Sequence, residues 1–156
     1  MRICLDSSYL LPLFGIGLED IPDDLLSRLS ERGHELLINE ISVFECAAKA
    51  AKLVISGRLR LKRLTDGLLG AAYSPALIRV SPYDLDIVRL AVEARRFLHD
   101  FIDCIILATA AMHADALLTE DCLLLRPPDQ LLRRIRAVNP RLVIMSLGDY
   151  AKRHGL

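Results

Sequence analysis

The strongest constraint on the fold of this chain is the alternation of short apolar runs with longer segments of helical periodicity. Five mostly apolar runs of three or four residues read as strands, at residues 2–5, 35–38, 77–80, 116–118 and 142–145. Helical spacing is expected over residues 21–32, 41–55, 58–72, 84–98, 101–114 and 129–138, with a last helix after Gly148. This alternation is typical of an α/β sandwich with a mostly parallel sheet.

The composition fits a single domain, residues 1–156, with an aliphatic core. Apolar residues make up 53% of the 156 residues and aromatic residues only 5%, which argues against a module that stacks RNA bases on aromatic rings. Lys+Arg and Asp+Glu balance at 20 each, so the net charge indicates no polyanionic partner. Basic residues still cluster locally, and both solvated helix faces and phosphate contacts would explain them; the clusters are Arg58, Arg60, Lys62 and Arg63, Arg95 and Arg96, and Arg133, Arg134, Arg136 and Arg141.

The distribution of apolar residues predicts a cytoplasmic, soluble protein with no membrane span. Asp6 interrupts the amino-terminal apolar run, which makes a poor secretory signal. The longest nearly continuous apolar run, residues 104–112, is far short of the roughly 20 residues that a transmembrane helix needs. The mean hydropathy of +0.33 is high for a small domain, so we expect some apolar surface to be buried in an oligomer.

Four carboxylates end or interrupt apolar segments: Asp6, Glu45, Asp103 and Asp121. Asp6 or Ser7 could cap a helix, and Asp103 lies in the first turn of its expected helix, where the helix dipole favours negative charge. Asp121 could close a turn. Glu45 is harder to explain, because it shares a helical face with apolar residues and an unpaired carboxylate there costs several kcal/mol, in order of magnitude. Lys49, four residues later, is the nearest cation that could reach it.

Taken together, the four acids predict a metal site. Asp6 and Asp121 follow expected parallel strands, and the carboxyl ends of such strands are where open α/β sheets gather their functional residues. Glu45 and Asp103 lie on helices that would cover the same sheet. Converging carboxylates repel one another unless a cation neutralises them, and Mg²⁺ and Mn²⁺ prefer oxygen ligands. A hydrated cation held in this way supports hydrolysis of a phosphodiester bond.

The segments LDSSYLL, ISVFECAA, DCIILATA and LLTED resemble, in order and approximate spacing, the four acidic motifs of PIN-domain proteins. The motifs stretch from residue 6 to residue 121, so the resemblance covers nearly the whole chain. It implies a three-layer α/β/α sandwich with a central, mostly parallel sheet. It also implies a Mg²⁺- or Mn²⁺-dependent endoribonuclease, and a VapC-like toxin that forms a homodimer and is held by a small antitoxin protein.

The resemblance also implies a role for individual residues. Asp6, Glu45, Asp103 and Asp121 would be the catalytic, metal-binding acids. Asp100, one helical turn before Asp103, would add an outer ligand, and Thr119 and Ser8 would place hydroxyls near the metal, with Thr119 the better candidate. The expected reaction is attack of a bound water on the scissile phosphate, leaving 3′-hydroxyl and 5′-phosphate ends. The chain departs from the family after Asp121, where Cys122 and two leucines replace a polar and an aromatic residue, and in extra length around residues 57–82.

Other functions remain open at this point. A PIN-like protein without catalysis would bind RNA or act as a scaffold, and a general RNA-processing nuclease would have no antitoxin. A haloacid-dehalogenase-like phosphatase is disfavoured, because that family needs a second Asp at the position of Ser8. A receiver domain is disfavoured by the lack of paired acids at the start and of a late lysine after a strand. The four cysteines, Cys4, Cys46, Cys104 and Cys122, each lie within two residues of one acid; we expect buried, reduced packing residues, with a disulfide as the alternative.

Overall fold

The protein folds around a five-stranded sheet in which every neighbouring pair is parallel. The computed structural model describes residues 1–155. The strands are β1 (Arg2–Leu5), β2 (Glu35–Asn39), β3 (Leu77–Val80), β4 (Ala116–Leu118) and β5 (Val143–Met145). Their order across the sheet is β3-β2-β1-β4-β5, with β1 at the centre, so β1 pairs directly with β4, far away in the sequence.

Nine helical segments connect and cover the strands within the described residues. They are η1 (Ser7–Phe14), α1 (Leu25–Glu31), α2 (Glu40–Ile55), α3 (Leu61–Tyr73), α4 (Leu85–Ala94), α5 (Phe101–His113), α6 (Cys122–Leu125), α7 (Asp129–Val138) and α8 (Leu147–His154). In the part of the chain that the structure covers, none of these helices is long and apolar enough to cross a membrane.

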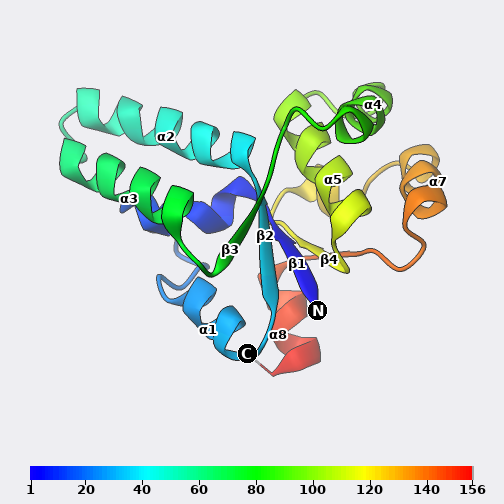
Figure 1. Ribbon diagram of the computed structural model, residues 1–156, viewed down its shortest axis with the longest axis horizontal. Coiled ribbons are helices and arrows are strands. Elements are labelled where there is room, and N and C mark those ends of the chain that lie inside the picture. Colours follow the sequence, from blue (N-terminus) through cyan, green and yellow to red (C-terminus); the bar gives the residue numbers. More distant parts are fainter. Residues whose placement is uncertain (156) are drawn as a thin grey trace.

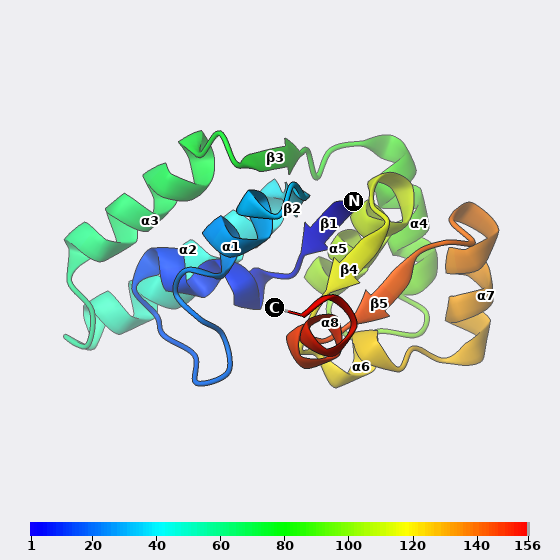
Figure 2. The ribbon, with the colours of Figure 1, turned by 90° about the horizontal axis from the view of Figure 1, so that it is seen from below.

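The sheet is covered on both faces, which confirms the three-layer α/β/α sandwich. Successive strand residues alternate between the faces: Ile3 and Leu5 join one buried cluster and Cys4 joins the other. The first cluster packs against η1, α1, α2, α3 and α8, and the second against α4, α5, α6 and α7. Figures 1 and 2 show these two groups of helices on opposite sides of the sheet. Aliphatic side chains therefore fill two separate hydrophobic cores, one on each face of the sheet.

Several element boundaries differ from those predicted. The helix expected over residues 58–72 starts only at Leu61, because Gly57 ends α2 in the left-handed conformation and a short turn follows. The helix expected over residues 84–98 ends at Ala94 and continues as turns, and the one expected over residues 21–32 begins only at Leu25. Two short helices, η1 and α6, were not predicted as elements, since eight and four residues give too little periodicity to read.

Helices α2 and α3 lie side by side and extend beyond the sheet in Figure 1. Helix α3 and strand β3 occupy the stretch of extra length around residues 57–82. Helix α3 approaches η1 closely at Gly67: a Cβ atom at this position would lie 2.7 Å from Phe14 Cα and 2.8 Å from the carbonyl oxygen of Leu13. Because both atoms belong to the backbone of η1, the glycine sets how near the two helices can pack.

Candidate active site

Asp6 occupies the centre of the carboxyl edge of the sheet, because it follows the central strand β1. Its backbone N–H donates to the carbonyl oxygen of Leu118 at 3.0 Å, which extends the pairing of β1 with β4. Its side chain is 8% exposed and caps η1, with Oδ1 accepting the N–H of Ser7 at 2.6 Å. Burial raises the pKa of this carboxyl, and the hydrogen bonds from Thr119 and Ser7 oppose that rise.

Thr119 joins Asp6 to the loop that carries Asp121. The Thr119 hydroxyl is buried and donates to Asp6 Oδ2 at 2.8 Å, and it accepts the backbone N–H of Asp121 at 3.0 Å. Asp121 then caps α6, because its Oδ1 accepts the N–H groups of Leu123 and Leu124 at 2.6 and 3.1 Å. The cap fixes one oxygen of Asp121, while Thr119 keeps this loop against Asp6.

Glu45 reaches the same edge from α2. Its Oε2 accepts the hydroxyl of Ser7 at 2.5 Å, and its Oε1 lies 2.6 Å from Lys49 Nζ. The Glu45 side chain is only 21% exposed, so the unpaired carboxylate that the sequence suggested is in fact paired with the cation four residues later. Ser7 thereby connects Glu45 to Asp6, the residue directly before it in the chain.

Asp103, in the first turn of α5, has the pKa that is most affected by the other acids. Burial and then the charges of Asp100, Asp6, Asp121 and Glu45 raise its pKa from 3.8 to about 7. A helix amino terminus favours a charged carboxylate, so the desolvation and the like charges outweigh the dipole here. Since Coulomb interactions weaken with distance, the four acids face a common region at the carboxyl ends of β1 and β4.

The donors in this region are all oxygen atoms, which fits a hard divalent cation such as Mg²⁺ or Mn²⁺. Within residues 1–155, no three His, Cys, Asp or Glu side chains are already grouped closely enough to hold a metal ion. Each of Asp6, Glu45 and Asp121 has at least one oxygen engaged with the protein. Mg²⁺ usually keeps several waters and binds only one or two carboxylates directly, so this arrangement suits a hydrated ion.

The other residues expected at the site lie nearby but are less engaged. Asp100 is exposed and caps α5 through the N–H of Ile102 at 2.8 Å. The Ser8 hydroxyl lies 3.5 Å from Asp6 Oδ2, at the limit of a hydrogen bond, so Thr119 makes the closer contact. Neither the sequence motif nor the spacing indicated Ser7, which contacts Glu45, because LDSS offers two hydroxyls and only the turn of η1 decides which one faces α2.

A second contact that the sequence did not suggest lies behind the site. Tyr9, which is 1% exposed, donates its hydroxyl to Glu120 Oε1 at 2.6 Å, and the same oxygen accepts the N–H of Leu147 at 2.9 Å. Glu120 lies between Thr119 and Asp121 in the chain. These contacts tie the loop after β4 to η1 on one side and to the start of α8 on the other.

The cysteines are free, as their default interpretation predicted, and three of them are buried. Burial raises the pKa of the Cys4 and Cys46 thiols to about 12 and that of Cys104 to about 11, so these thiols are not poised as nucleophiles. The expectation that all four are buried is wrong for Cys122, which is exposed because it begins the one-turn helix α6. Among residues 1–155, which contain all four cysteines, no pair forms a disulfide.

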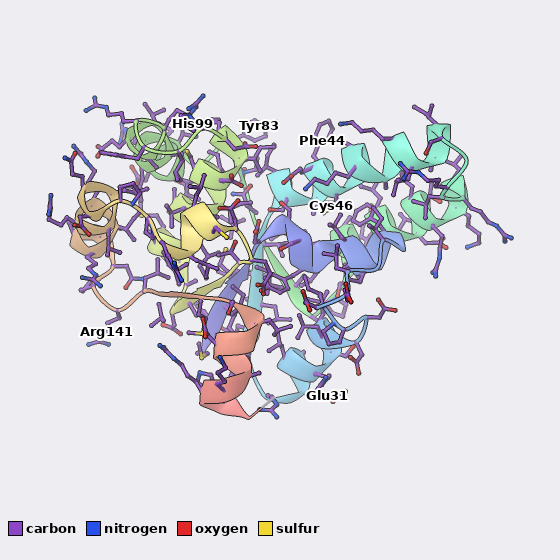
Figure 3. All side chains as sticks on the ribbon, turned by 180° about the vertical axis from the view of Figure 1, so that it is seen from behind. Glu31, Phe44, Cys46, Tyr83, His99 and Arg141 are labelled. Carbon is purple, nitrogen blue, oxygen red and sulfur yellow. The ribbon has the colours of Figure 1, made fainter. Side chains whose placement is uncertain are left out.

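Exposed aromatic residues lie at the end of the molecule where the carboxyl ends of the central strands and the four acids are found. Figure 3 shows Phe44, near the start of α2, together with Tyr83 and His99, which precede α4 and α5, while Glu31 of α1 lies at the opposite end. The Phe44 side chain is 71% exposed and that of Tyr83 is 86% exposed.

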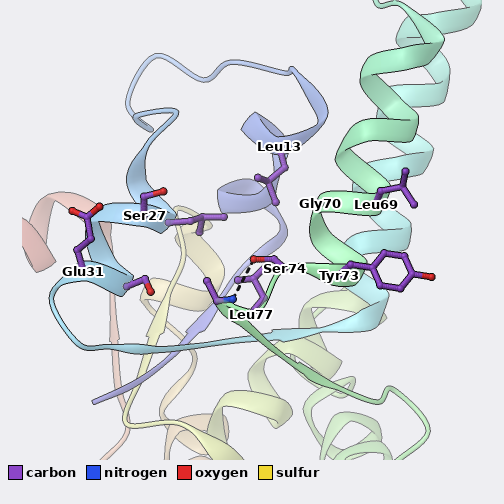
Figure 4. Close-up of a pocket in the computed structure, with 11 residues that line it drawn as sticks. Leu13, Ser27, Glu31, Leu69, Gly70, Tyr73, Ser74 and Leu77 are labelled. Atoms are coloured by element: carbon purple, nitrogen blue, oxygen red, sulfur yellow. Dashed lines mark hydrogen bonds between the residues drawn. The ribbon is translucent and has the colours of Figure 1, made fainter.

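A wide groove lies away from the acids, between α1 and α3. This groove has a volume of about 710 Å³. Figure 4 shows Leu13, Leu69, Tyr73 and Leu77 among its lining residues, with Ser27 and Glu31 contributed by α1. Its lining is mainly apolar, and none of the four acids belongs to it. The groove is therefore a surface separate from the acidic region.

Comparison with known proteins agrees with this arrangement. A crystal structure of VapBC2 from Rickettsia felis, bound to a DNA fragment from its promoter, contains a chain of similar fold, with a TM-score of 0.58 and 15% identity. The similarity covers 94% of this chain and 98% of that one. Among curated proteins, none matches this sequence. Residues 3–127 match the PIN domain, a stretch that includes all four acids. The chain therefore belongs to the PIN-domain family.

Proposed function

We propose that this protein is a Mg²⁺- or Mn²⁺-dependent endoribonuclease that acts in the cytoplasm. PIN domains are generally nucleases, and the chain keeps an acid at each of the four motif positions. The observation that carries the proposal is the gathering of four acids at one edge of the sheet: hydrogen bonds through Ser7 and Thr119 connect Glu45, Asp6 and Asp121, and the charges of these three acids help to raise the pKa of Asp103. Four acids from β1, α2, α5 and the loop after β4 form a negative site that a divalent cation would neutralise.

The residues at this site have different proposed roles. Asp6, Glu45, Asp103 and Asp121 would hold the cation directly or through its waters, and Asp100 would act from outside this set. Thr119 orients Asp6, and the cap on α6 orients Asp121. When bound, the cation would lower the pKa of an attacking water and neutralise charge that develops on the scissile phosphate. Cleavage of the P–O3′ bond leaves a 3′-hydroxyl and a 5′-phosphate.

A scaffold without catalysis explains the acids less well. The raised pKa of Asp103 shows that its charged form is disfavoured in the metal-free fold, so the cluster lowers stability at neutral pH. A protein that only bound RNA would gain nothing from a carboxylate cluster facing a polyanion. Metal-dependent hydrolysis gives each acid a function.

RNA cleavage by the purified protein tests the proposal. A single-stranded RNA incubated with the protein and Mg²⁺ or Mn²⁺ should be cut internally, and mapping of the products should find 5′-phosphate ends. EDTA should stop cleavage, and an excess of Mn²⁺ should restore it, because the acids lose their counter-ion and regain it. Cleavage that persists at full rate in EDTA would show that the proposed chemistry is wrong.

We further propose that the protein is the toxin of a VapBC-type pair and forms a homodimer. The similar structure is a VapBC complex, which supports a small antitoxin as the partner. The groove of Figure 4 gives an apolar surface suited to a protein segment rather than to RNA. Tyr83, Leu85 and Val92 are 86%, 69% and 56% exposed, and they leave apolar area available for a second copy of the chain.

Expression in a bacterium tests the toxin proposal separately from the chemistry. Induced expression of the chain should arrest growth, and co-expression of a small protein encoded beside its gene should relieve the arrest and yield a stable complex on purification. Normal growth together with metal-dependent cleavage in vitro would instead identify a general RNA-processing nuclease without an antitoxin.

A further inference from the structure

Strand β5 forms an open edge of the sheet. It pairs with β4 on one side, and in the described part of the chain no strand lies on its other side. The N–H of Val143 donates to the carbonyl oxygen of Asp115 at 3.0 Å. The N–H of Thr119 donates to the carbonyl oxygen of Met145 at 3.1 Å. Because alternate residues of a strand face the same neighbour, the N–H and C=O of Ile144 point away from β4. Figure 2 shows β5 as the outermost strand, on the side of α7.

A groove with a volume of about 560 Å³ lies at this edge, between β5, α7 and the end of α6. We call it the β5 groove. Most of its lining is apolar and half-buried, and this part consists of Leu125, Pro127, Leu132, Leu142 and Ile144. Among the described residues, no carboxylate lines it. The β5 groove therefore joins an apolar lining to an open strand edge.

The charged side chains of the β5 groove, among the described residues, are those of Arg136 and Arg141. Both are exposed, and neither forms an ion pair within that part of the chain. By contrast, Arg134 on the same helix pairs with Glu93 at 2.6 Å. Arg136 lies in the last turn of α7, where the helix dipole favours a positive charge, yet its side chain donates no hydrogen bond to another described residue. The groove thus offers two positive charges to a negatively charged partner.

This combination fits an acidic peptide in extended conformation. A strand added to β5 would pair with the free N–H and C=O of Ile144, and its alternate side chains would reach the apolar lining and the two arginines. A second copy of the chain would add its own arginines to the same groove, and like charges oppose that contact. Single-stranded RNA stacks its bases on aromatic rings, and none of the described lining residues is aromatic.

We propose that the β5 groove binds an acidic, extended segment of a partner protein by strand addition. The backbone of Ile144 sets the register of the segment, the apolar lining receives every second side chain, and Arg136 and Arg141 bind its carboxylates. In Figure 3, Arg141 lies away from Phe44, which is found at the end of the molecule that holds the four acids. The surface is thus separate from the candidate active site, and the inference does not depend on the proposed nuclease function.

Fluorescence anisotropy on the full-length protein tests the inference, in EDTA so that RNA stays intact. A short labelled peptide in which glutamate and valine alternate should bind. The same peptide with glutamine in place of glutamate should bind about 10-fold more weakly, because hydrogen bonds to a charged group are stronger than neutral ones. Arg136→Gln and Arg141→Gln should each weaken binding of the acidic peptide about 5- to 10-fold. Arg133→Gln is the matched control, since Arg133 is exposed on the same helix but lies outside the groove; binding should stay within about twofold.

Methylated peptides test strand addition without any change to the protein. Two further peptides carry N-methyl groups on one or the other set of alternate residues. Only one edge of the added strand faces β5, so one of these two peptides should bind about 10-fold more weakly than the other, because it has lost the N–H groups that pair with Ile144.

Several results would overturn the inference. They are no binding of the acidic peptide, equal binding of the two methylated peptides, and an equal loss of affinity in Arg133→Gln and the two groove variants. A labelled single-stranded RNA whose affinity falls with the same two groove substitutions would also overturn it, and would identify an RNA-binding surface instead. Circular dichroism of each variant should match the wild-type spectrum, because all three arginines are exposed. None of these measurements involves RNA cleavage, so the nuclease proposal stands or fails separately.

Discussion

Replacing Asp103 with asparagine should abolish RNA cleavage and, at the same time, stabilise the metal-free protein at pH 8. Loss of a carboxylate that holds the cation should lower kcat/KM by at least about 10²-fold, the order of effect seen when one electrostatic group of a preorganised site is removed. The stabilisation follows from the raised pKa of about 7, which means that the folded state disfavours the charged carboxylate.

The pH dependence has a defined sign. Because the folded-state pKa is raised above the ordinary value of 3.8, the contribution of Asp103 to stability is complete below about pH 4 and is lost as the pH rises through about 7. The Asp103 side chain is partly exposed, so after allowance for screening we expect a difference of about 1 kcal/mol between pH 4 and pH 8. Thermal unfolding in EDTA should show a melting temperature for Asp103→Asn about 3 °C above wild type at pH 8.

Asp86→Asn is the matched control for this experiment. Asp86 lies in the first turn of α4, as Asp103 does in α5, but it is exposed and pairs with Arg89 at 3.0 Å. Its replacement should leave cleavage within about twofold and lower the stability by a few tenths of a kcal/mol, roughly, through the helix dipole. If Asp103→Asn instead destabilised the metal-free protein at pH 8, the carboxylate would be structural and its assignment to the site would fail.

Gly67→Ala should destabilise the protein by about 2 kcal/mol, the largest stability effect that we expect from a single methyl group. The added Cβ would lie 2.7 Å from Phe14 Cα and 2.8 Å from the Leu13 carbonyl oxygen, so α3 and η1 must separate. Overpacking at backbone atoms costs about 1–3 kcal/mol, and the higher helix propensity of alanine offsets part of that. Urea unfolding monitored by circular dichroism measures the change.

The substitution Gly70→Ala separates the effect of close packing on stability from the effect of helix propensity. Gly70 lies three residues later on the same helix, and no atom lies within 4 Å of a Cβ placed there. We therefore expect Gly70→Ala to stabilise the protein by about 0.5–1 kcal/mol, the gain in helix propensity. Equal effects of the two substitutions, in either direction, would show that the close approach of α3 to η1 does not limit the packing.

The strand and helix pattern could be predicted because hydrophobic periodicity survives in short segments. The runs at residues 77–80 and 116–118 became β3 and β4 with the predicted bounds, and the acids after β1 and β4 meet because those strands pair in parallel. The order of the strands could not be read from the sequence, since a run such as ALL gives no indication of its neighbours. Their position after expected parallel strands suggested that residues 6 and 121 come together, and the resemblance to PIN domains supported it.

The details of the site depended on local geometry that periodicity does not encode. The structural explanation of Asp6 is confirmed, because the residue caps η1. Its catalytic role stays a prediction, and the capping carboxyl lies close enough to Glu45 and Asp121 for their charges to raise its pKa. Lys49 was the nearest candidate partner for Glu45 and is in fact 2.6 Å away. The contact of Tyr9 with Glu120 joins residues 111 positions apart, and no local sequence pattern indicates a contact between residues so far apart.

The direct pairing of β1 with β4 has a consequence for the synthesis of the protein. The Thr119 hydroxyl must reach Asp6 across 113 residues of sequence, and Leu147 must be made before its N–H can hold Glu120. A ribosome therefore releases most of the 156-residue chain before the site exists. On the proposed function, the nascent polypeptide is inert beside the messenger RNA that encodes it. If the proposed function holds, the strand order itself would delay the activity until translation is nearly complete.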